Sequence, residues 1–452
     1  MIYAAIFLMG CGLKIHFSYA YLLPLFLLFY TAPKRTFLSI PLLLAAYSYA
    51  PTDPCVKKPI YQEGVFTAHS WIKQNSHFRT SYKGKGTVQI GGRSWKANLY
   101  LPYEPKEIAR YQFSGIIKQK RPFTLILYPK KPLQKIETLP FASAKKRLQK
   151  KLDLVIEKQI PEKEVAHFLQ AFFFGNQSDP FLRYAFRSLG LSHILAISGL
   201  HFCLLAGIFF TLWKWLTNRT IALSLSIFCI VIYGFFIDSS PSSIRALCMI
   251  VAAFTAELTG KKTRACNLLA FACLVELTLN PLSLITPSFQ LSFSSCTALL
   301  FFQIPCMQVV QRILGSSSAF QGPFFLKVSV YLQEALAASF AIYLVSGPLV
   351  LCHFSTLSLS SLFYNLFAPL LIVCAMTLWA IFWPLCGMFT IKYFLLLSTK
   401  IALSTCLYPP YFMRDWAVFF PLPVDFVILW ISMLLFIGFT LQARGSFGYD
   451  TI

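Results

Sequence analysis

The residues with the most chemical potential lie in an uncharged stretch, GLSHILAISGLH, residues 190–201. Its polar side chains belong to Ser192, His193, Ser198 and His201. At 100° per residue, one helix would place His193 and His201 about 80° apart, so it would carry a polar stripe. Polar groups in a bilayer are costly unless they face a cavity or a partner helix. The stretch therefore predicts either a pore-facing helix or one that packs through small residues and hydrogen bonds.

The same serine and histidine residues raise two other chemistries. No carboxylate or cysteine accompanies the histidines, and no Cys/His cluster in the chain has zinc-site spacing, so we predict no metal and no cofactor. AISG, residues 196–199, is similar to the GxSG nucleophile site of rhomboid proteases, although Ala196 replaces the first glycine. An intramembrane serine protease is thus a weaker alternative, and we assign no catalytic residues.

Three further polar clusters interrupt apolar sequence. PSSIRA, residues 241–246, contains Arg245, which either snorkels to the membrane interface or offers a fixed positive charge to an anion. The others are NPLSLITPSFQLSFSS, residues 280–295, and NLFAP, residues 365–369. Taking the clusters together, the residues that we predict to line a channel are Ser192, His193, Ser198, His201, Arg245, Gln290, Ser292 and Asn365.

The composition shows what kind of element must hold these residues. Only 13% of the 452 residues are charged, against about 25% in soluble domains, and 56% are hydrophobic. A helix needs about 20 apolar residues to cross a bilayer. No Lys, Arg, Asp or Glu occurs in residues 188–213, 277–311, 335–391 and 426–443. The chain is therefore predicted to be a polytopic α-helical membrane protein, which excludes a disordered chain or a disulfide-stapled secreted domain.

The predicted organisation alternates between apolar and polar sequence. Residues 1–50 are expected to form short transmembrane segments, 51–140 a basic soluble domain, 141–172 a basic amphipathic connector along the membrane surface, and 173–445 a multi-helix channel domain. The expected spans are 190–213, 220–237, 244–259, 266–280, 286–305, 330–352, 360–389 as a broken pair, 391–408 and 425–443.

The polar insert is strongly basic. Residues 51–160 contain 22 Lys and Arg against 7 Asp and Glu, while the whole chain has a formal net charge of +23. One reading is a domain that needs charge for solubility. The other is a surface for a polyanion, either nucleic acid or anionic lipid headgroups.

The first part of this insert has the pattern of a small β-barrel. Thr87–Ile90 and Arg93–Leu101 flank Gly91-Gly92, which is typical of a β-hairpin. Within the second run Trp95, Ala97, Leu99 and Leu101 alternate with Lys96, Asn98 and Tyr100. One face is therefore predicted to be apolar and the other basic and aromatic. Further predicted strands are Gly64–Lys73, His77–Tyr82, Arg110–Ile117 and Phe123–Tyr128. A series of short strands such as this favours an inserted barrel of the five-stranded oligonucleotide-binding (OB-fold-like) type.

The outward face of this barrel mixes cations with aromatic rings. Single-stranded nucleic acid is commonly held by a cationic groove together with aromatic stacking faces. The residues that we predict to bind DNA are Trp71, Arg79, Tyr82, Lys83, Lys85, Arg93, Lys96 and Tyr100.

In combination, these clusters resemble the ComEC/Rec2 competence protein family, inner-membrane channels for DNA uptake in natural transformation. GLSHILAISGLH is close to the family's most distinctive motif. GNQSD, residues 175–179, precedes it where the family shows a GDRS-like sequence. PSSIRALCM, NPLSLITPSFQLSFSS and NLFAP follow in the family's order, and a basic barrel after short N-terminal spans matches as well.

The resemblance implies that the chain carries single-stranded DNA from the outer side of the membrane to the cytoplasm. It places the barrel on the extracytoplasmic side of a bacterial inner membrane. The implied partners are single-stranded DNA, membrane lipid, a periplasmic DNA receptor, a cytoplasmic helicase or translocase, single-strand-binding proteins and a second copy of the chain. Because no P-loop is present, another protein would have to supply the force.

The sequence departs from the family pattern in two ways. Many members carry a C-terminal metallo-β-lactamase-like domain, whereas this chain has no HxHxDH cluster, so we expect a short form that is a channel rather than an enzyme. Asn176 and Gln177 replace the acidic and basic residues of the GDRS-like site. A transporter of lipid or cell-wall precursors, with a basic domain for anionic headgroups, stays open as an alternative.

Overall fold

The structure is a computed structural model of the 452-residue chain, of which it describes a large part. The predicted segments at 1–50 and most of the last predicted span lie outside the described residues. The described residues are 60–75, 80–90, 93–103, 108–121, 124–138, 140–176, 179–195, 197–237, 240–315, 323–383, 389–407, 417–423 and short pieces between 426 and 438.

The chain divides into two compact units. One is Pro51–Val155, which we call the barrel unit. The other joins Met1–Ala50 to Ile156–Ile452, and we call it the membrane unit.

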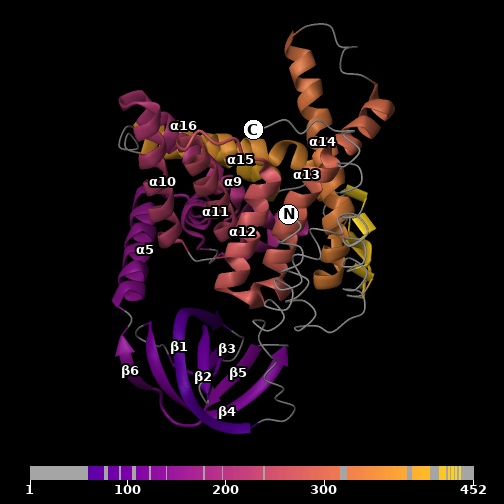
Figure 1. Cartoon of the computed structure of the whole chain (residues 1–452). Helices are drawn as coiled ribbons and strands as arrows, with labels where there is room; N and C mark the ends of the chain where they lie inside the picture. The colour runs from indigo at the N-terminus through magenta and orange to yellow at the C-terminus, as the bar shows by residue number, and fades with distance from the viewer. Residues whose placement is uncertain are drawn as a thin grey trace. The chain divides into compact units, whose positions relative to one another are not determined.

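The barrel unit contains a closed five-stranded barrel (Figure 1). The strands run in the order β1-β2-β3-β5-β4, and β4 pairs again with β1. The β3–β5 pair is parallel, whereas the other pairs are antiparallel. The predicted OB-fold-like barrel is confirmed. Its strands are β1 (Ile60–Asn75), β2 (Thr80–Ile90), β3 (Arg93–Leu101), β4 (Ala109–Arg121) and β5 (Thr124–Pro129), with β6 (Gln134–Thr138) added to β4.

The core of the barrel follows the predicted period of two. Ala97, Leu99 and Leu101 of β3 are buried, with Phe66 of β1 and Phe113 of β4 among their neighbours in the core. Since successive side chains of a strand point to opposite faces, the residues between them face outward. The alternation in the sequence therefore identified the inner face of this strand.

Two predicted strands were wrong in their bounds. The stretches 77–82 and 87–90 were separated because glycines interrupt the pattern, but β2 runs unbroken from Thr80 to Ile90, while residues 77–79 lie outside the described residues. At Gly86 an added Cβ would lie 2.0 Å from the carbonyl oxygen of Thr67, so glycine here permits β1 to approach closely. Strand β6, which lies mostly in exposed polar sequence, was not predicted.

The membrane unit is helical, and six of its described helices are long and apolar enough to cross a membrane: α9, α10, α11, α13, α14 and α15. The predicted multi-pass membrane protein is thereby confirmed. The helices are α5 (Pro140–Gln159, which begins in the barrel unit), α6 (Lys163–Phe174), α7 (Pro180–Ser188), α8 (Ser192–Leu195), α9 (Gly199–Leu216), α10 (Arg219–Phe236), α11 (Pro241–Leu258), α12 (Ala265–Leu279), the 3-10 helix η2 (Pro281–Ile285), α13 (Pro287–Leu314), α14 (Pro323–Phe354), α15 (Ser360–Phe382) and α16 (Phe389–Leu407).

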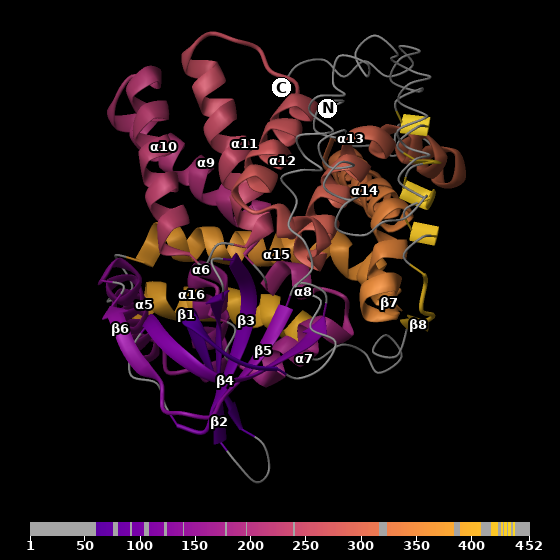
Figure 2. The same cartoon turned by 60° about the horizontal axis from the view of Figure 1, so that its bottom comes forward.

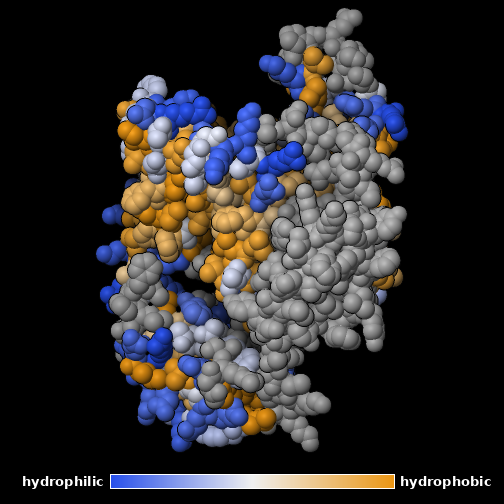
Figure 3. Space-filling view, viewed as in Figure 1, coloured by the Kyte–Doolittle hydropathy of each residue, from blue (hydrophilic) through white to orange (hydrophobic). Residues whose placement is uncertain are grey.

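Within this unit, α9, α10, α11 and α12 stand side by side, and α15 and α16 run across them in both views (Figures 1 and 2). The helices α6, α7 and α8 pack with α15 and α16 around a core that includes Phe168, Phe186 and Trp379. The surface over α9–α12 forms an apolar belt that ends in a hydrophilic rim (Figure 3). A short strand, β7 (Thr356–Ser358), pairs with β8 (Ala417–Phe419).

Three predicted segments differ in the structure. The span 190–213 is broken, because α8 ends at Leu195 and α9 begins at Gly199. The stretch 360–389 contains one continuous helix, α15, rather than a broken pair. The connector 141–172 folds as two helices, because α5 ends at Gln159 and α6 begins at Lys163. Pro161 lies between them, and proline disfavours a helical conformation at the residue before it.

Candidate functional site

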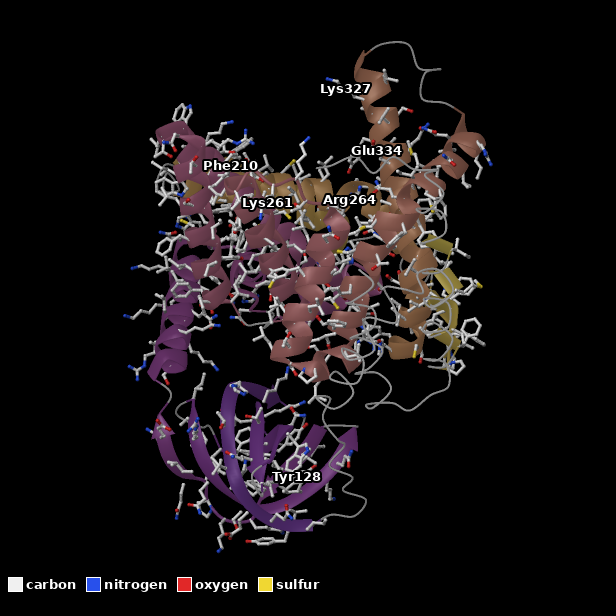
Figure 4. The ribbon with its side chains drawn as sticks, viewed as in Figure 1. Tyr128, Phe210, Lys261, Arg264, Lys327 and Glu334 are labelled. Atoms are coloured by element: carbon white, nitrogen blue, oxygen red, sulfur yellow. The ribbon has the colours of Figure 1, made fainter. Side chains whose placement is uncertain are left out.

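On the outer surface of the barrel unit, two lysines and two tyrosines form a continuous row across four neighbouring strands. Lys83 Nζ lies 5.7 Å from the ring centroid of Tyr100, and Lys118 Nζ lies 5.7 Å from that of Tyr128. The rings of Tyr100 and Tyr128 are stacked, with centroids 6.0 Å apart and planes 17° from parallel. We call these four residues the stacked row; Figure 4 labels Tyr128 within the barrel.

The strand register produces this row. Lys83 of β2 is paired with Tyr100 of β3, and Leu99 with Leu127, so Tyr128 follows beside Tyr100 on the parallel strand β5. Cations held over aromatic faces combine attraction to phosphate with a surface for base stacking. Tyr128 keeps 41% of its surface exposed, so its ring is available to a ligand.

The predicted DNA-binding residues divide into three groups. Lys83 and Tyr100 belong to the stacked row, Lys85 is exposed two residues further along the same strand face, and Tyr82 is half-buried against the core. Arg79 lies outside the described residues. The structure describes the strand backbone but not the side chains of Trp71, Arg93 and Lys96.

In the membrane unit, a second group of polar residues surrounds Arg245, whose side chain is buried in the second turn of α11. Arg245 Nη1 donates a hydrogen bond of 2.6 Å to the carbonyl oxygen of Ser292 on α13 and also contacts Cys296 Sγ. The guanidinium carbon lies 5.9 Å from the ring centroid of Phe293. At Gly199, an added Cβ would lie 3.1 Å from Arg245 Nη2, so glycine lets the guanidinium lie against the start of α9.

The start of α9 is built by Ser198 and His201. Ser198 has extended backbone angles, φ −124° and ψ 177°, and caps the helix. Its amide donates to His201 Nδ1 at 3.1 Å, and its hydroxyl lies at the same distance from that nitrogen. His201 is 1% exposed, and its ring centroid lies 3.8 Å from that of Phe172. We refer to Ser198, Gly199, His201, Arg245 and Ser292 as the polar centre.

This geometry corrects two expectations. His193 and His201 do not share one helix face, because the chain breaks between α8 and α9. The Ser198–His201 contact matches a capping box, in which residues three apart satisfy the first helical amides, and we assign it to capping. Ser192 and His193 are exposed on α8.

Of the other predicted channel residues, Gln290 lies in a contact between helices, whereas Asn365 does not join the polar centre. Gln290 Oε1 is 2.7 Å from Nε2 of His353 on α14. The side-chain amide nitrogen of Gln290, Nε2, donates a hydrogen bond of 2.8 Å to the carbonyl oxygen of Leu284. Asn365 on α15 is half-buried, and its Oδ1 has no hydrogen-bond partner in the part of the chain that the structure describes. The structure therefore joins Ser198, His201, Arg245 and Ser292 but leaves the rest apart.

The GNQSD stretch adjoins the polar centre. Gly175, in the left-handed region at φ 75°, lies against Ile197, and Ser242 Oγ of α11 donates to the carbonyl of Ile197 at 3.1 Å. Asp179 caps α7, and its Oδ2 lies 3.0 Å from His167 Nδ1. Burial raises the pKa of Asp179, but the hydrogen bonds from His167 and two backbone amides outweigh it, so the net pKa is below its ordinary value.

Several residues at these sites were not predicted from the sequence. Lys118 and Tyr128 were not assigned to the DNA-binding face, although both fall in predicted strands. Alternation shows which residues share a face, but it does not show which strands become neighbours. Glu276 is buried within α12, and a lone acid inside an apolar stretch was a signal that could have identified it. Among the described residues, no three His, Cys, Asp or Glu side chains are grouped to hold a metal ion.

A family model described as "Competence protein" matches residues 173–444 of this chain. The chain belongs to the competence protein family. The matched residues include every helix from α7 to α16 and the whole polar centre. The resemblance that the motifs indicated is therefore confirmed at the level of the family.

One curated relative is "ComE operon protein 3" of Bacillus subtilis strain 168, which is 30% identical over 183 residues. The match covers 40% of this chain and 21% of the relative, so the chain spans about a fifth of that protein's length. No solved structure gives a significant match.

Proposed function

We propose that this member of the competence protein family binds single-stranded DNA through its barrel and carries it across the membrane. The observation that supports this most directly is the stacked row, in which Lys83 and Lys118 flank Tyr100 and Tyr128. Base stacking on aromatic side chains contributes about 1–3 kcal/mol per base and tolerates any sequence, which suits a strand that must slide.

The charges at the helix ends support an orientation for the membrane unit. Among the connections between α9 and α15, seven lysines and arginines lie at one end of the helices, whereas the opposite connections, residues 237–240, 280–286 and 355–359, contain none. Short basic loops favour the cytoplasm, so we assign the basic end to that side. These residues are Lys214, Arg219, Lys261, Lys262, Arg264, Arg312 and Lys327, three of which Figure 4 labels.

The same reasoning assigns the barrel to the opposite, extracytoplasmic side. No described helix before Gly199 is long and apolar enough to span a membrane, and α9 then runs from Gly199 to the basic end at Lys214. The barrel and the start of α9 are therefore expected on one side. Tagging the β2–β3 turn with an enzyme that folds only outside the cytoplasm would test this, and activity of a cytoplasm-only reporter there would contradict it.

Uptake of labelled DNA by cells that lack the gene tests the main proposal. Deletion should leave DNA bound at the cell surface while nuclease-resistant DNA inside the cell falls to background. Complementation by the wild-type gene should restore entry. Unchanged entry in the deletion strain would contradict the proposal.

A competition experiment separates DNA from the lipid-headgroup alternative. The full chain in dodecyl maltoside is mixed with a fluorescent oligothymidine strand, and anionic phosphatidylglycerol vesicles are added as competitor. We expect the fluorescence anisotropy of the strand to stay at its bound value when vesicles are added. The stacked row offers rings on which bases stack and lipid headgroups cannot. Complete displacement by vesicles at equal phosphate concentration would favour the lipid transporter.

A further inference from the structure

The amino ends of α9 and α11 meet at the polar centre, and α13 contributes a backbone carbonyl from its second turn. Helix α9 begins at Gly199, α11 at Pro241 and α13 at Pro287. Ser242 Oγ links α11 to the carbonyl of Ile197 just before α9, and Arg245 links α11 to both Gly199 and α13. Because Arg245 is the fifth residue of its helix, it lies only about 6 Å along the axis from that end.

This convergence concentrates positive charge. Each helix amino end carries roughly half an elementary positive charge from its aligned peptide dipoles. The guanidinium of Arg245 adds a full charge, and at 8% exposure it has little water to screen it. Anions bind at helix amino ends for these reasons, and an arginine that points there strengthens the site.

Two buried donors at this place have no acceptor. Arg245 Nε and His201 Nε2 lack hydrogen-bond partners within the residues described by the structure. His201 Nδ1 accepts from the amide of Ser198, so in the neutral ring the proton lies on Nε2. Buried donors without partners are costly, which indicates that a ligand group with acceptor oxygens completes the site at some stage.

We propose that the polar centre binds a single phosphodiester group of the transported strand at the outer end of the membrane unit. The nature of the anion rests on the proposed function, whereas the convergence of charge and donors does not. The phosphate would accept hydrogen bonds from Arg245 beside Gly199, at the end where α9 and α11 begin.

Dimethyl phosphate, a phosphodiester without bases, tests the site separately from the barrel's stacking surface. The full chain is purified in dodecyl maltoside, which contains no phosphate, and its thermal unfolding is followed at constant ionic strength. We expect a saturable rise in the melting temperature of the wild type, because a ligand of the native state stabilises it. Absence of a saturable rise in the wild type overturns the proposal.

Variants locate the effect. Arg245→Gln should abolish the rise, while Lys83→Gln in the barrel and Arg264→Gln, an exposed arginine at the basic end, should retain it. Gly199→Ala removes no charge but places a methyl group against Arg245 Nη2, and it should weaken binding several-fold. If Arg245→Gln does not fold, Gly199→Ala therefore decides whether dimethyl phosphate binds at the polar centre. A full rise in the folded polar-centre variants overturns the proposal.

The outcome also separates this site from the proposed function. If dimethyl phosphate fails to stabilise a chain that supports DNA entry, the phosphate site is wrong and the DNA-uptake function stands. If dimethyl phosphate binds through Arg245 in a chain whose deletion leaves DNA entry unchanged, the anion site stands and the proposed function is wrong.

Discussion

The barrel unit and the membrane unit both present cations beside aromatic rings, but they hold them in opposite ways. Lys83 and Lys118 lie over tyrosine rings on the surface of the barrel, where water and salt can reach them. Arg245 lies near Phe293, buried between helices and bonded to a backbone carbonyl. Each region thus places a cation beside an aromatic ring, but in a different dielectric environment.

This difference determines what each cation can do. An exposed lysine forms contacts that exchange quickly and weaken as salt rises. A buried arginine is expensive to insert, because translocon-based scales give about 2.5–3.5 kcal/mol for Arg at a helix centre, which is an upper bound for Arg245 in the second turn of α11. Charged residues within membrane helices are therefore rare unless they have a function. We expect loss of Arg245 to affect DNA entry more than the stability of the fold.

Replacement of Arg245 by methionine should have the largest effect. The substitution keeps a long flexible side chain but removes the charge, and replacing buried charges with apolar residues is often neutral or stabilising. We expect DNA entry to fall about 100-fold, since a buried charge contact contributes about 3 kcal/mol, while the melting temperature does not fall. Arg264→Met, at an exposed arginine, should change neither quantity. If Arg245→Met unfolds the protein, Arg245 is structural and the contrast between the units fails.

The matching test in the barrel removes both rings of the stacked row. Tyr100→Ala with Tyr128→Ala should weaken binding of an oligothymidine strand by at least tenfold, because each ring contributes about 1–3 kcal/mol of stacking. Fluorescence anisotropy with the full chain measures this. Tyr103→Ala, an exposed tyrosine outside the row, is the control and should leave affinity unchanged. Equal losses in the row and in the control would show that the rings act nonspecifically.

The sequence predicted the barrel well because its signals are local. Alternation in β3 placed Ala97, Leu99 and Leu101 in the core without knowledge of any partner strand. It could not pair Tyr100 with Tyr128, because that contact depends on the parallel β3–β5 pairing between segments far apart in the chain. Local pattern thus identified the inner face, while the assembled fold determined which outer residues became neighbours.

In the membrane unit, the sequence identified the polar centre's members but not their geometry. The stretch 190–201 contains no proline and no charged residue, so nothing marked the break at Ser198. The break becomes favourable because Ser198 and His201 cap α9 and because Gly199 admits Arg245 from α11. The approach of Arg245 to Gly199 is a tertiary contact, and the apolar composition of the stretch does not predict it.

The lysines of the stacked row should affect salt dependence more than affinity at a single salt concentration. Each phosphate contact to a single strand contributes about 0.7 to the slope of log affinity against log salt. Lys83→Gln with Lys118→Gln should therefore reduce that slope by about 1.4. Lys130→Gln with Lys131→Gln, in the exposed turn after β5, removes the same charge and should change the slope less. Equal reductions would mean that the barrel attracts DNA by net charge alone.

The smallest expected effect concerns Asp179, a polar group of the membrane unit outside its spanning helices. Asp179→Ala removes both the α7 cap and the contact with His167, and loss of a cap costs about 0.5–2 kcal/mol. Asp179→Asn keeps a capping side chain and removes only the charge, so it should cost less.

The pH dependence of Asp179→Asn follows from the lowered pKa of the aspartate. A carboxyl whose pKa is depressed by folding stabilises the native state above its unfolded pKa of about 3.9, and this contribution disappears as the pH falls through the folded value. The difference in melting temperature between wild type and Asp179→Asn should therefore persist from neutral pH to about pH 4 and close below it. A difference that grows as the pH falls would contradict this assignment. Folding would then favour the protonated form of the Asp179 carboxyl. The environment of this side chain would resemble that of the buried polar centre and not that of the exposed barrel surface.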